Sequence, residues 1–315
     1  MLQKKPFDVI VIGGGPAGMS AALILARCVR SVLIFDSGRP RNFKAKSMNG
    51  FISRDGSNPM EFLRTTREQL QKYPVVFKNN KVEKINKLDD NSFEIIDSEY
   101  NRYYSKKVLL ATGLIDEIPD IGNIHKFYGS SVHHCPYCDG WELRLKPLAV
   151  VGKGKSGVGL ALSLTNWSDD IVLLTNGKEI SKEEKEKLVL KNIEILDKKV
   201  DRLEGDSGQI EKIYFNDGSF IERCALFFTT EQFQRSNLAE QLGCQFTKKG
   251  GVKVNRFQQT SIKGVYVAGD ASKDVQLVIM AAAEGAKAAV VINRDLQKEE
   301  SKLKQISRNI QLHTM

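Results

Sequence analysis

Apolar residues in this chain fall into short runs separated by glycine-rich turns or polar stretches. Residues 7–12, 31–35 and 107–110 are almost unbroken apolar runs, as expected of strands that are buried on both faces of a parallel sheet. Between the first two runs, residues 19–28 carry the small and apolar side chains of a packed helix. The order strand, helix, strand predicts an α/β fold around a parallel sheet.

The same order recurs in the second half of the chain. An apolar run at residues 148–151 is followed by a helical pattern at 158–165 and another run at 171–174. Two such units predict two Rossmann-like nucleotide-binding domains, each a three-layer sandwich with helices packed on a sheet.

The remaining stretches predict less regular structure. Residues 37–60 are rich in Gly, Pro, Asn, Arg and Ser and are expected to form a long loop. Residues 277–293 predict an alanine-rich helix, and the charged tail at 297–315 is expected to fray. A small antiparallel insert is predicted from three alternating runs, at residues 75–77, 81–85 and 92–96.

A glycine fingerprint follows the first predicted strand. Residues 13–18 read Gly-Gly-Gly-Pro-Ala-Gly, which fits the pattern Gly-x-Gly-x-x-Gly. Gly13 permits a tight turn, Gly15 lets a pyrophosphate approach the backbone, and Gly18 lets helix and strand pack closely. The next strand ends at Asp36, whose carboxylate can accept hydrogen bonds from ribose hydroxyls. The complete order of strand, glycine loop, helix, strand and acidic residue predicts a bound dinucleotide. The alternative is that the glycines serve only the packing of helix against strand.

A second fingerprint, Gly152-x-Gly154-x-x-Gly157, follows the run at 148–151. It departs from the template because the next strand runs into Thr175-Asn-Gly-Lys178, without an acid for an NAD ribose or an arginine for a 2′-phosphate. A nicotinamide cofactor, NADPH or NADH, is the first expectation for this site. Another nucleotide or flavin, or a site that has lost binding, remains open.

A third motif, Cys135-Pro-Tyr-Cys138, carries the redox chemistry. Two sulfurs at this spacing can form and reopen a disulfide. Asp139 follows directly and His133 and His134 precede, so each is a candidate proton carrier, with Asp139 the first choice and His134 the second. For the cysteines, the alternatives are half of a zinc site or structural thiols. For Asp139 the alternative is capping of the following turn, and for the histidines it is ordinary packing.

Composition narrows the class of protein. The 315 residues are 41% hydrophobic and 27% charged, as in soluble globular chains. No apolar run approaches the roughly 18 residues that span a membrane. Five cysteines with one close pair suit a reducing compartment, so we expect a cytoplasmic protein. The net charge is +9, but lysines alternate with acids along the chain, which argues against nucleic-acid binding.

The order of these motifs closely resembles the low-molecular-weight thioredoxin reductases, which are FAD-dependent pyridine nucleotide–disulfide oxidoreductases. The resemblance rests on the two fingerprints, on Ala111-Thr-Gly113, on Cys135-Pro-Tyr-Cys138-Asp139 and on Gly269-Asp270. It implies a homodimer with a discontinuous FAD domain, residues 1–115 and 246–315. An NAD(P)H-type domain, residues 116–245, is implied to be inserted into it and to carry the cysteines.

The resemblance also implies positions for the cofactor. Thr112 would belong to the flavin turn, Asp270 would bond the ribityl chain, and Gln276 would lie near the isoalloxazine ring. Cys138 would be the sulfur next to the flavin. The full set of implied FAD contacts is Gly13, Gly15, Pro16, Ala17, Gly18, Asp36, Arg41, Asn49, Val82, Thr112, Asp270 and Gln276.

Several departures look more like a divergent branch of this family. Pro136-Tyr137 stands inside the redox motif, Val275 precedes Gln276, and no arginine cluster follows Leu174. That branch includes dithiol oxidases and reductases with other electron donors. The expected activity is electron transfer from NADPH through FAD and the cysteines to a thioredoxin-like protein or small disulfide. The alternatives are a dithiol oxidase that uses oxygen, a reductase that takes electrons from a donor such as ferredoxin, and a non-catalytic redox sensor.

Overall fold

The computed structural model describes residues 6–313, and these fall into two compact units. The first contains the chain up to Arg41, Met60–Ile115 and the chain from Phe233 onward. The second contains Asn42–Pro59 and Asp116–Gln232. Each unit is built around its own parallel sheet, and each is described separately.

The sheet of the first unit has its fingerprint strand near the centre. The strands lie in the order β3-β2-β1-β6-β5-β4, and β17 pairs in addition with β6. Strands β3, β2, β1, β6 and β17 are mutually parallel, whereas β4 and β5 are antiparallel to their neighbours. The bounds are β1 Phe7–Ile12, β2 Val32–Phe35, β3 Val75–Lys78, β4 Val82–Lys87, β5 Phe93–Asp97, β6 Arg102–Leu110 and β17 Val265–Val267.

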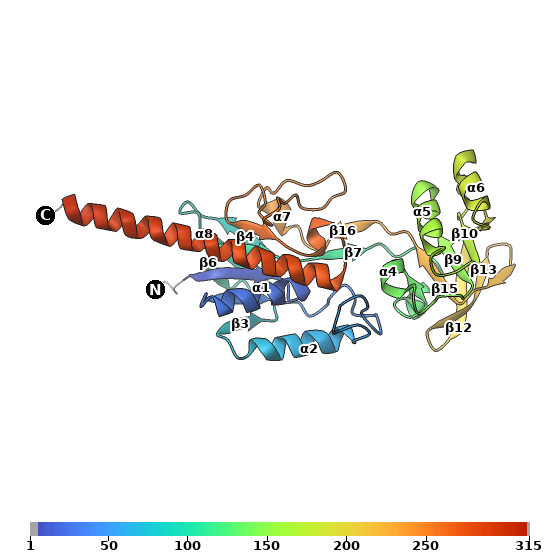
Figure 1. Ribbon diagram of the computed structural model, residues 1–315, viewed down its shortest axis with the longest axis horizontal. Coiled ribbons are helices and arrows are strands. Elements are labelled where there is room, and N and C mark those ends of the chain that lie inside the picture. Colours follow the sequence, from blue (N-terminus) through green and yellow to red (C-terminus); the bar gives the residue numbers. More distant parts are fainter. Residues whose placement is uncertain (1–5, 314–315) are drawn as a thin grey trace. The chain divides into compact units, whose positions relative to one another are not determined.

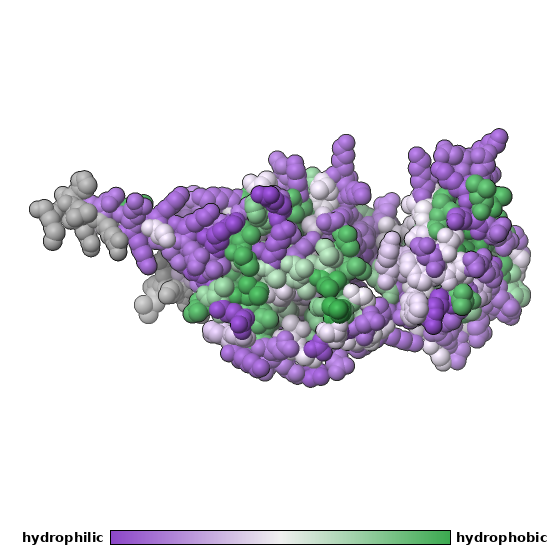
Figure 2. Space-filling view, viewed as in Figure 1, coloured by the Kyte–Doolittle hydropathy of each residue, from purple (hydrophilic) through white to green (hydrophobic). Residues whose placement is uncertain are grey.

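Two helices cover one face of this sheet. α1 (Pro16–Arg27) and α8 (Val278–His313) lie against each other over the strands (Figure 1). Their core combines Val9 and Ile34 of the sheet with Ala22 of α1 and Ala288 of α8, all fully buried. On the face drawn in Figure 2, hydrophobic side chains gather over this pair of helices, and hydrophilic ones predominate along the part of α8 beyond it. The other face packs against α7 (Leu238–Gln241) and its neighbouring loops.

The predicted fraying of the tail is wrong for residues 297–313, and residues 314–315 lie outside the described part. α8 continues without a break to His313. Its middle is tied to the sheet because Glu299 accepts a hydrogen bond at 2.7 Å from the buried ammonium of Lys107. Glu300 forms an ion pair with Arg30 at the end of α1. These two anchors hold the helix where its apolar face ends.

The predicted insert is also partly wrong, because β3 does not belong to it. β3 pairs in parallel with β2, in the register Val32↔Val75. The helix α2 (Pro59–Leu70) lies between them in sequence and makes the crossover that a parallel pair needs. Only β4 and β5 form the antiparallel insert, together with the start of β6.

The second unit has a five-stranded parallel sheet in the order β11-β10-β9-β15-β8. Helices α5 (Gly154–Leu164) and α6 (Lys182–Val189) cover one face. An antiparallel sheet of β12 (Val200–Asp206), β13 (Gln209–Phe215) and β14 (Phe220–Glu222) covers the other. The parallel strands are β8 Val132–His133, β9 Leu148–Val151, β10 Ile171–Leu174, β11 Glu194–Leu196 and β15 Ala225–Phe228. Two short helices, α3 (Ile124–Phe127) and α4 (Pro136–Asp139), flank β8 in sequence.

The chain passes between the units four times. Two of these passages contain β7 (Leu114–Asp116) and β16 (Gln232–Gln234), which pair with each other as a two-stranded sheet. Within residues 6–313, no helix combines the length and apolar character needed to cross a membrane.

Candidate dinucleotide sites and redox centre

The first glycine loop has the close approaches that its sequence predicts. Gly13 has a φ of +112°, and a Cβ there would lie 2.1 Å from the carbonyl oxygen of Ala111. A Cβ on Gly18 would lie 1.9 Å from the carbonyl oxygen of Gly13. Gly15, by contrast, has no atom within 4 Å of the Cβ position, so the N-terminus of α1 faces open space. The loop therefore leaves room for an anionic group at its second glycine.

Asp36 lies at the carboxyl end of β2, beside this loop. Its carboxylate accepts a hydrogen bond from the Gly38 N–H at 3.0 Å and forms an ion pair with Arg67 at 3.1 Å. The guanidinium of Arg67 also stacks over the ring of Phe77, 5.1 Å from its centroid. Arg67 is a residue that sequence reasoning missed, because it lies in the last turn of α2, far from any motif. It holds the Asp36 carboxylate in place at the edge of the sheet.

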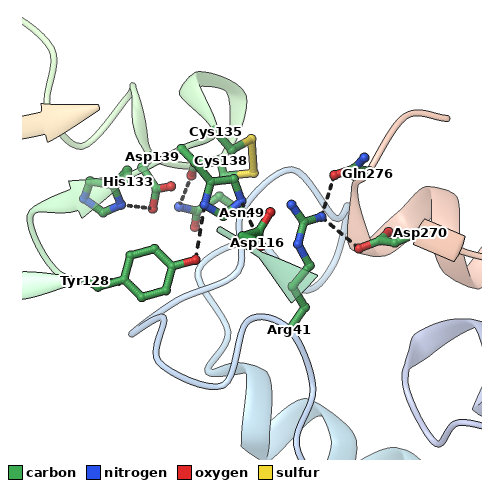
Figure 3. Close-up of a disulfide and its surroundings, with 11 residues drawn as sticks. Arg41, Asn49, Asp116, Tyr128, His133, Cys135, Cys138, Asp139, Asp270 and Gln276 are labelled. Carbon is green, nitrogen blue, oxygen red and sulfur yellow. Dashed lines mark hydrogen bonds and ion pairs between the residues drawn. A yellow bond between two sulfur atoms is a disulfide. The ribbon is translucent and has the colours of Figure 1, made fainter. Parts of the chain in front are cut away.

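Three of the positions expected to contact FAD meet in the first unit. Arg41 donates to the Asp270 carboxylate at 3.0 Å and to the Gln276 side-chain oxygen at 2.6 Å, as Figure 3 shows. Asp270 begins the 3₁₀ turn η1 (Asp270–Ser272), directly after β17 and Gly269. Thr112 follows β6 at the same carboxyl edge, and Val82 is buried at the start of β4.

Glu284, on α8, supports this edge and was not predicted. Its carboxylate accepts a hydrogen bond from the Gly269 N–H at 2.7 Å. Burial raises the pKa of Glu284 above its usual range, and the negative charges of Asp274 and Asp270 act in the same direction, against the Gly269 hydrogen bond. The contact fixes the turn that carries Asp270.

The second glycine loop is also tightly built. A Cβ on Gly152 would lie 2.5 Å from the Cα of Gly157. Thr175 directly follows strand β10, and its hydroxyl is buried and has no hydrogen-bond partner among the described residues. The next side chain, Asn176, is used structurally, because its oxygen accepts from the Val200 N–H at 2.9 Å. The fold of a nucleotide site is present, but the ribose-binding acid of the template is not.

The cysteines lie at the carboxyl end of the second sheet. β8 ends at His133, and Cys135 stands directly before the short helix α4. Cys135 and Cys138 form a disulfide, with their Cα atoms 5.3 Å apart. The glycine loop after β9 opens at the same edge of this parallel sheet. Ligand-binding crevices of α/β sheets lie outside the carboxyl ends of their strands.

The two histidines before the disulfide have different acidic partners. His133 is buried against the ring of Phe227 and faces the Asp139 carboxylate, with Nδ1 and Oδ1 3.2 Å apart (Figure 3). His134 packs against Phe228, and its Nε2 lies 3.9 Å from a carboxylate oxygen of Asp116.

The Asp116 carboxylate belongs to a larger polar group around His134. The hydroxyl of Tyr128 lies 3.4 Å from the His134 Nδ1, and the Gln232 amide donates to Asp116 at 3.1 Å. The Asp116 side chain is only 4% exposed. Asp116, Tyr128 and Gln232 come from three separate segments without a motif, so no sequence pattern points to them.

Asn49 lies with the redox motif. Its amide donates a hydrogen bond to the carbonyl oxygen of Cys138 at 2.7 Å (Figure 3). The surrounding loop, Asn42–Pro59, belongs to the same unit as the cysteines. Across residues 6–313, no group of three or more His, Cys, Asp or Glu side chains is arranged to hold a metal ion.

Comparisons with known proteins agree with this architecture. Residues 7–285 match the family described as "Pyridine nucleotide-disulphide oxidoreductase". A probable thioredoxin reductase from Arthroderma benhamiae is 32% identical over 94% of this chain and 81% of its own length. A crystal structure of a putative thioredoxin reductase from Bacillus anthracis is 37% identical, with a TM-score of 0.89 over 93% of this chain and 99% of the other. The crystal structure of HlmI is 32% identical, with a TM-score of 0.94 over 98% of this chain and 99% of the other.

Proposed function

The chain belongs to the pyridine nucleotide–disulphide oxidoreductase family, and from this premise we propose that Cys135 and Cys138 are the redox-active pair that exchanges electrons with a substrate disulfide. The protein is a flavin-dependent disulfide oxidoreductase of the thioredoxin-reductase type. The observation that carries the proposal is the disulfide at the carboxyl edge of the second sheet, with a His–Asp pair beside it.

The first unit fits FAD. The open position at Gly15 and the N-terminus of α1 would take the pyrophosphate, and Asp36 would accept from the ribose hydroxyls. Arg41, Asp270 and Gln276 would line the flavin end, because they already form one hydrogen-bonded group. When bound, FAD supplies the electron pair that converts the disulfide to a dithiol.

The cysteines then do the substrate chemistry. One thiolate attacks a sulfur of the substrate disulfide and forms a mixed disulfide, and the second thiolate resolves it. The released substrate thiolates take up two protons, while Cys135 and Cys138 return to the disulfide. Asp139 is the first candidate proton carrier, and its contact with His133 gives the proton a second site 3.2 Å away.

NADPH is the first electron donor to test, with NADH second. The glycine loop after β9 and the open N-terminus of α5 support a nucleotide at this position. Lys153 and Lys155 are exposed there and could attract a phosphate. The neutral Thr175 at the end of β10 argues against the usual ribose contact.

The deciding experiment is an anaerobic titration of the FAD-loaded protein with NADPH and then NADH, followed by flavin absorbance. Stoichiometric bleaching by either nucleotide supports the reductase, and oxidised thioredoxin is the next substrate to try. A flavin that stays oxidised with both nucleotides, yet bleaches with dithiothreitol or a reduced ferredoxin, refutes a pyridine nucleotide donor.

The missing ribose acid favours one second candidate, a dithiol oxidase. A small dithiol would pass its electrons through Cys135 and Cys138, and molecular oxygen would accept them. The same protein would then consume oxygen with a dithiol and without any pyridine nucleotide. An oxygen electrode distinguishes the two, because a reductase of this type needs its nucleotide for turnover.

A further inference from the structure

The short helix α4 leaves the carbonyl group of Cys138 without a partner inside the helix. Its own backbone hydrogen bonds run to the carbonyl oxygens of Cys135 and Pro136, and the last carbonyl groups of a helix have no helical donor. Across residues 6–313, no backbone N–H donates to the Cys138 oxygen. The side-chain amide of Asn49 does so, at 2.7 Å (Figure 3). A residue from a distant loop therefore completes the hydrogen bonding of the redox motif.

The residues around Asn49 hold its side chain in place. Met48 and Ser57 form an antiparallel bridge, in which the Met48 N–H donates to the Ser57 carbonyl oxygen at 2.8 Å. The Gly50 N–H donates to the Asp55 carboxylate at 2.7 Å, and the Met48 side chain is buried. An amide that is already ordered loses little entropy when it forms a hydrogen bond. The bond to Cys138 is therefore made by a prepared donor.

A second contact fixes the same loop beside the segment that precedes the cysteines. Gly129 has a φ of +85°, and a Cβ there would lie 2.6 Å from the carbonyl oxygen of Lys44. The Lys44 ammonium lies 5.9 Å from the centroid of the Tyr128 ring. The loop, Asn42–Pro59, belongs to the same compact unit as these residues. It thus contacts both the redox motif and the segment that leads into it.

The disulfide fixes the carbonyl group that Asn49 binds. In this structure Cys135 and Cys138 are joined, with their Cα atoms 5.3 Å apart, so a covalent ring spans the first turn of α4. Reduction adds two electrons and two protons, breaks the S–S bond and leaves two thiols. A helix of four residues is not stable by itself, so α4 is held less firmly in the dithiol form. A contact that is stronger in one of two states shifts the equilibrium toward that state.

We propose that Asn49 is a positioning residue that stabilises the disulfide form of Cys135 and Cys138 and so lowers the midpoint potential of this pair. The inference rests on the proposed function, because the potential matters for activity only if the pair exchanges electrons with the flavin and a substrate. It also implies that the loop Asn42–Pro59 is held more tightly in the oxidised protein than in the reduced one.

The test measures the thiol–disulfide equilibrium of the FAD-loaded protein. Wild type, Asn49→Ala and Asn49→Gln are equilibrated anaerobically with mixtures of dithiothreitol and its cyclic disulfide, so that each protein disulfide that opens oxidises one dithiothreitol. Iodoacetamide then traps the thiols, and the tryptic peptide 127–144, which contains both cysteines, reports the reduced fraction by mass spectrometry. Asn58→Ala is the matched control, because the Asn58 amide donates to a backbone carbonyl within the same loop at 3.3 Å.

Asn49→Ala should shift the equilibrium about fivefold toward the dithiol, as for the loss of one hydrogen bond. This corresponds to a rise of about 20 mV in the midpoint potential, because a tenfold change equals about 30 mV for a two-electron couple. Asn49→Gln keeps the amide donor and should restore part of the shift, and Asn58→Ala should match the wild type. An unchanged equilibrium in Asn49→Ala, or an equal shift in Asn58→Ala, overturns the proposal. An Asn49→Ala protein that loses FAD at the wild-type equilibrium assigns Asn49 to the flavin instead.

Limited digestion with trypsin gives a second readout. Lys44, Lys46 and Arg54 are exposed within the loop. Cleavage there should be slower in the oxidised than in the reduced wild type, and Asn49→Ala should be cleaved at the faster rate in both states. Equal rates in the two states of the wild type overturn the redox dependence of the contact. A wild-type pair that dithiothreitol reduces, yet that passes no electrons to the flavin, refutes the proposed function and leaves the effect of Asn49 on the potential standing.

Discussion

At Gly285, one added methyl group should strongly lower the free energy of unfolding of the first unit. It lies in α8 where this helix crosses α1, and a Cβ there would come within 2.0 Å of the Ala17 carbonyl oxygen. The next atoms are also backbone, at 2.7 and 2.9 Å, so no side-chain rotation can relieve the contact. Ala17 belongs to the first turn of α1, two residues after Gly15.

The magnitude follows from two opposing terms. Replacing a helical glycine by alanine stabilises the helix by about 1 kcal/mol. Contacts below 3.0 Å are essentially never seen, so Gly285→Ala must move α1 and α8 apart by about 1 Å. Overpacking costs typically about 1–3 kcal/mol, and the upper end applies because backbone meets backbone. We expect Gly285→Ala to lower the free energy of unfolding of the first unit by about 2 kcal/mol.

Gly159→Ala is the matched control, with the opposite sign. Gly159 is an exposed glycine within α5, and no atom lies within 4 Å of its Cβ position. Only the helix term applies, so this variant should stabilise the second unit by about 1 kcal/mol. The same substitution should therefore produce opposite effects in two helices.

Urea titration can follow each unit separately. Both tryptophans, Trp141 and Trp167, lie in the second unit, so tryptophan fluorescence reports its unfolding. Release of flavin fluorescence reports loss of the first unit. Gly285→Ala should release FAD at lower urea with little change in the tryptophan transition. A Gly285→Ala protein that retains FAD as tightly and unfolds at the same urea concentration as wild type would refute the reasoning.

Three further predictions test other contacts. Arg41→Met removes the hydrogen-bond donor to Asp270 and should weaken FAD binding about tenfold, because a hydrogen bond to a charged group contributes about 1.5–3 kcal/mol. Flavin release on dilution measures the FAD affinity, and an unchanged affinity contradicts this prediction. Cys138→Ser should abolish turnover and leave Cys135 in a stable mixed disulfide with its substrate, visible by mass spectrometry; continued turnover would exclude this pair. Burial raises the pKa of Asp97, but hydrogen bonds from neighbouring side chains and backbone outweigh it, and the pKa lies below its usual range. Asp97 thus stabilises the fold above its unfolded pKa and loses this effect as the pH falls through the folded pKa, so Asp97→Asn should be most destabilising near neutral pH in urea titrations and progressively less so in acid.

The parallel core could be predicted because its signals are local. Strands buried on both faces give unbroken apolar runs, and the glycine pattern after β1 stands where the backbone makes a close approach at Gly13. The partner of β3 could not be predicted in this way, because its short run fits either an antiparallel insert or an edge of the main sheet. The full length of α8 was missed because its second half is polar and is held by the distant Lys107 and Arg30.

In the candidate site, too, residues with local sequence signals could be predicted and residues held by distant contacts could not. The cysteine pair and the glycine loops are each contiguous in sequence, so their spacing is enough to identify them. Arg67 and Glu284 act on Asp36 and on the Gly269 turn from helices far along the chain, and helical spacing alone makes them look like ordinary surface residues. Such supporting contacts depend on which helix crosses which strand end, which a single sequence does not specify.

The two histidines show why adjacent residues can have different roles. Successive side chains of a strand point to opposite faces, and His133, at the end of β8, packs on Phe227 whereas the next residue, His134, packs on Phe228. His133 meets Asp139, which comes from the redox motif itself, so its loss should act on the cysteines locally. His134 meets Asp116, which lies where the chain passes between the units. The second pair therefore links the residue before Cys135 to the connecting strands, although nothing in the local sequence relates them.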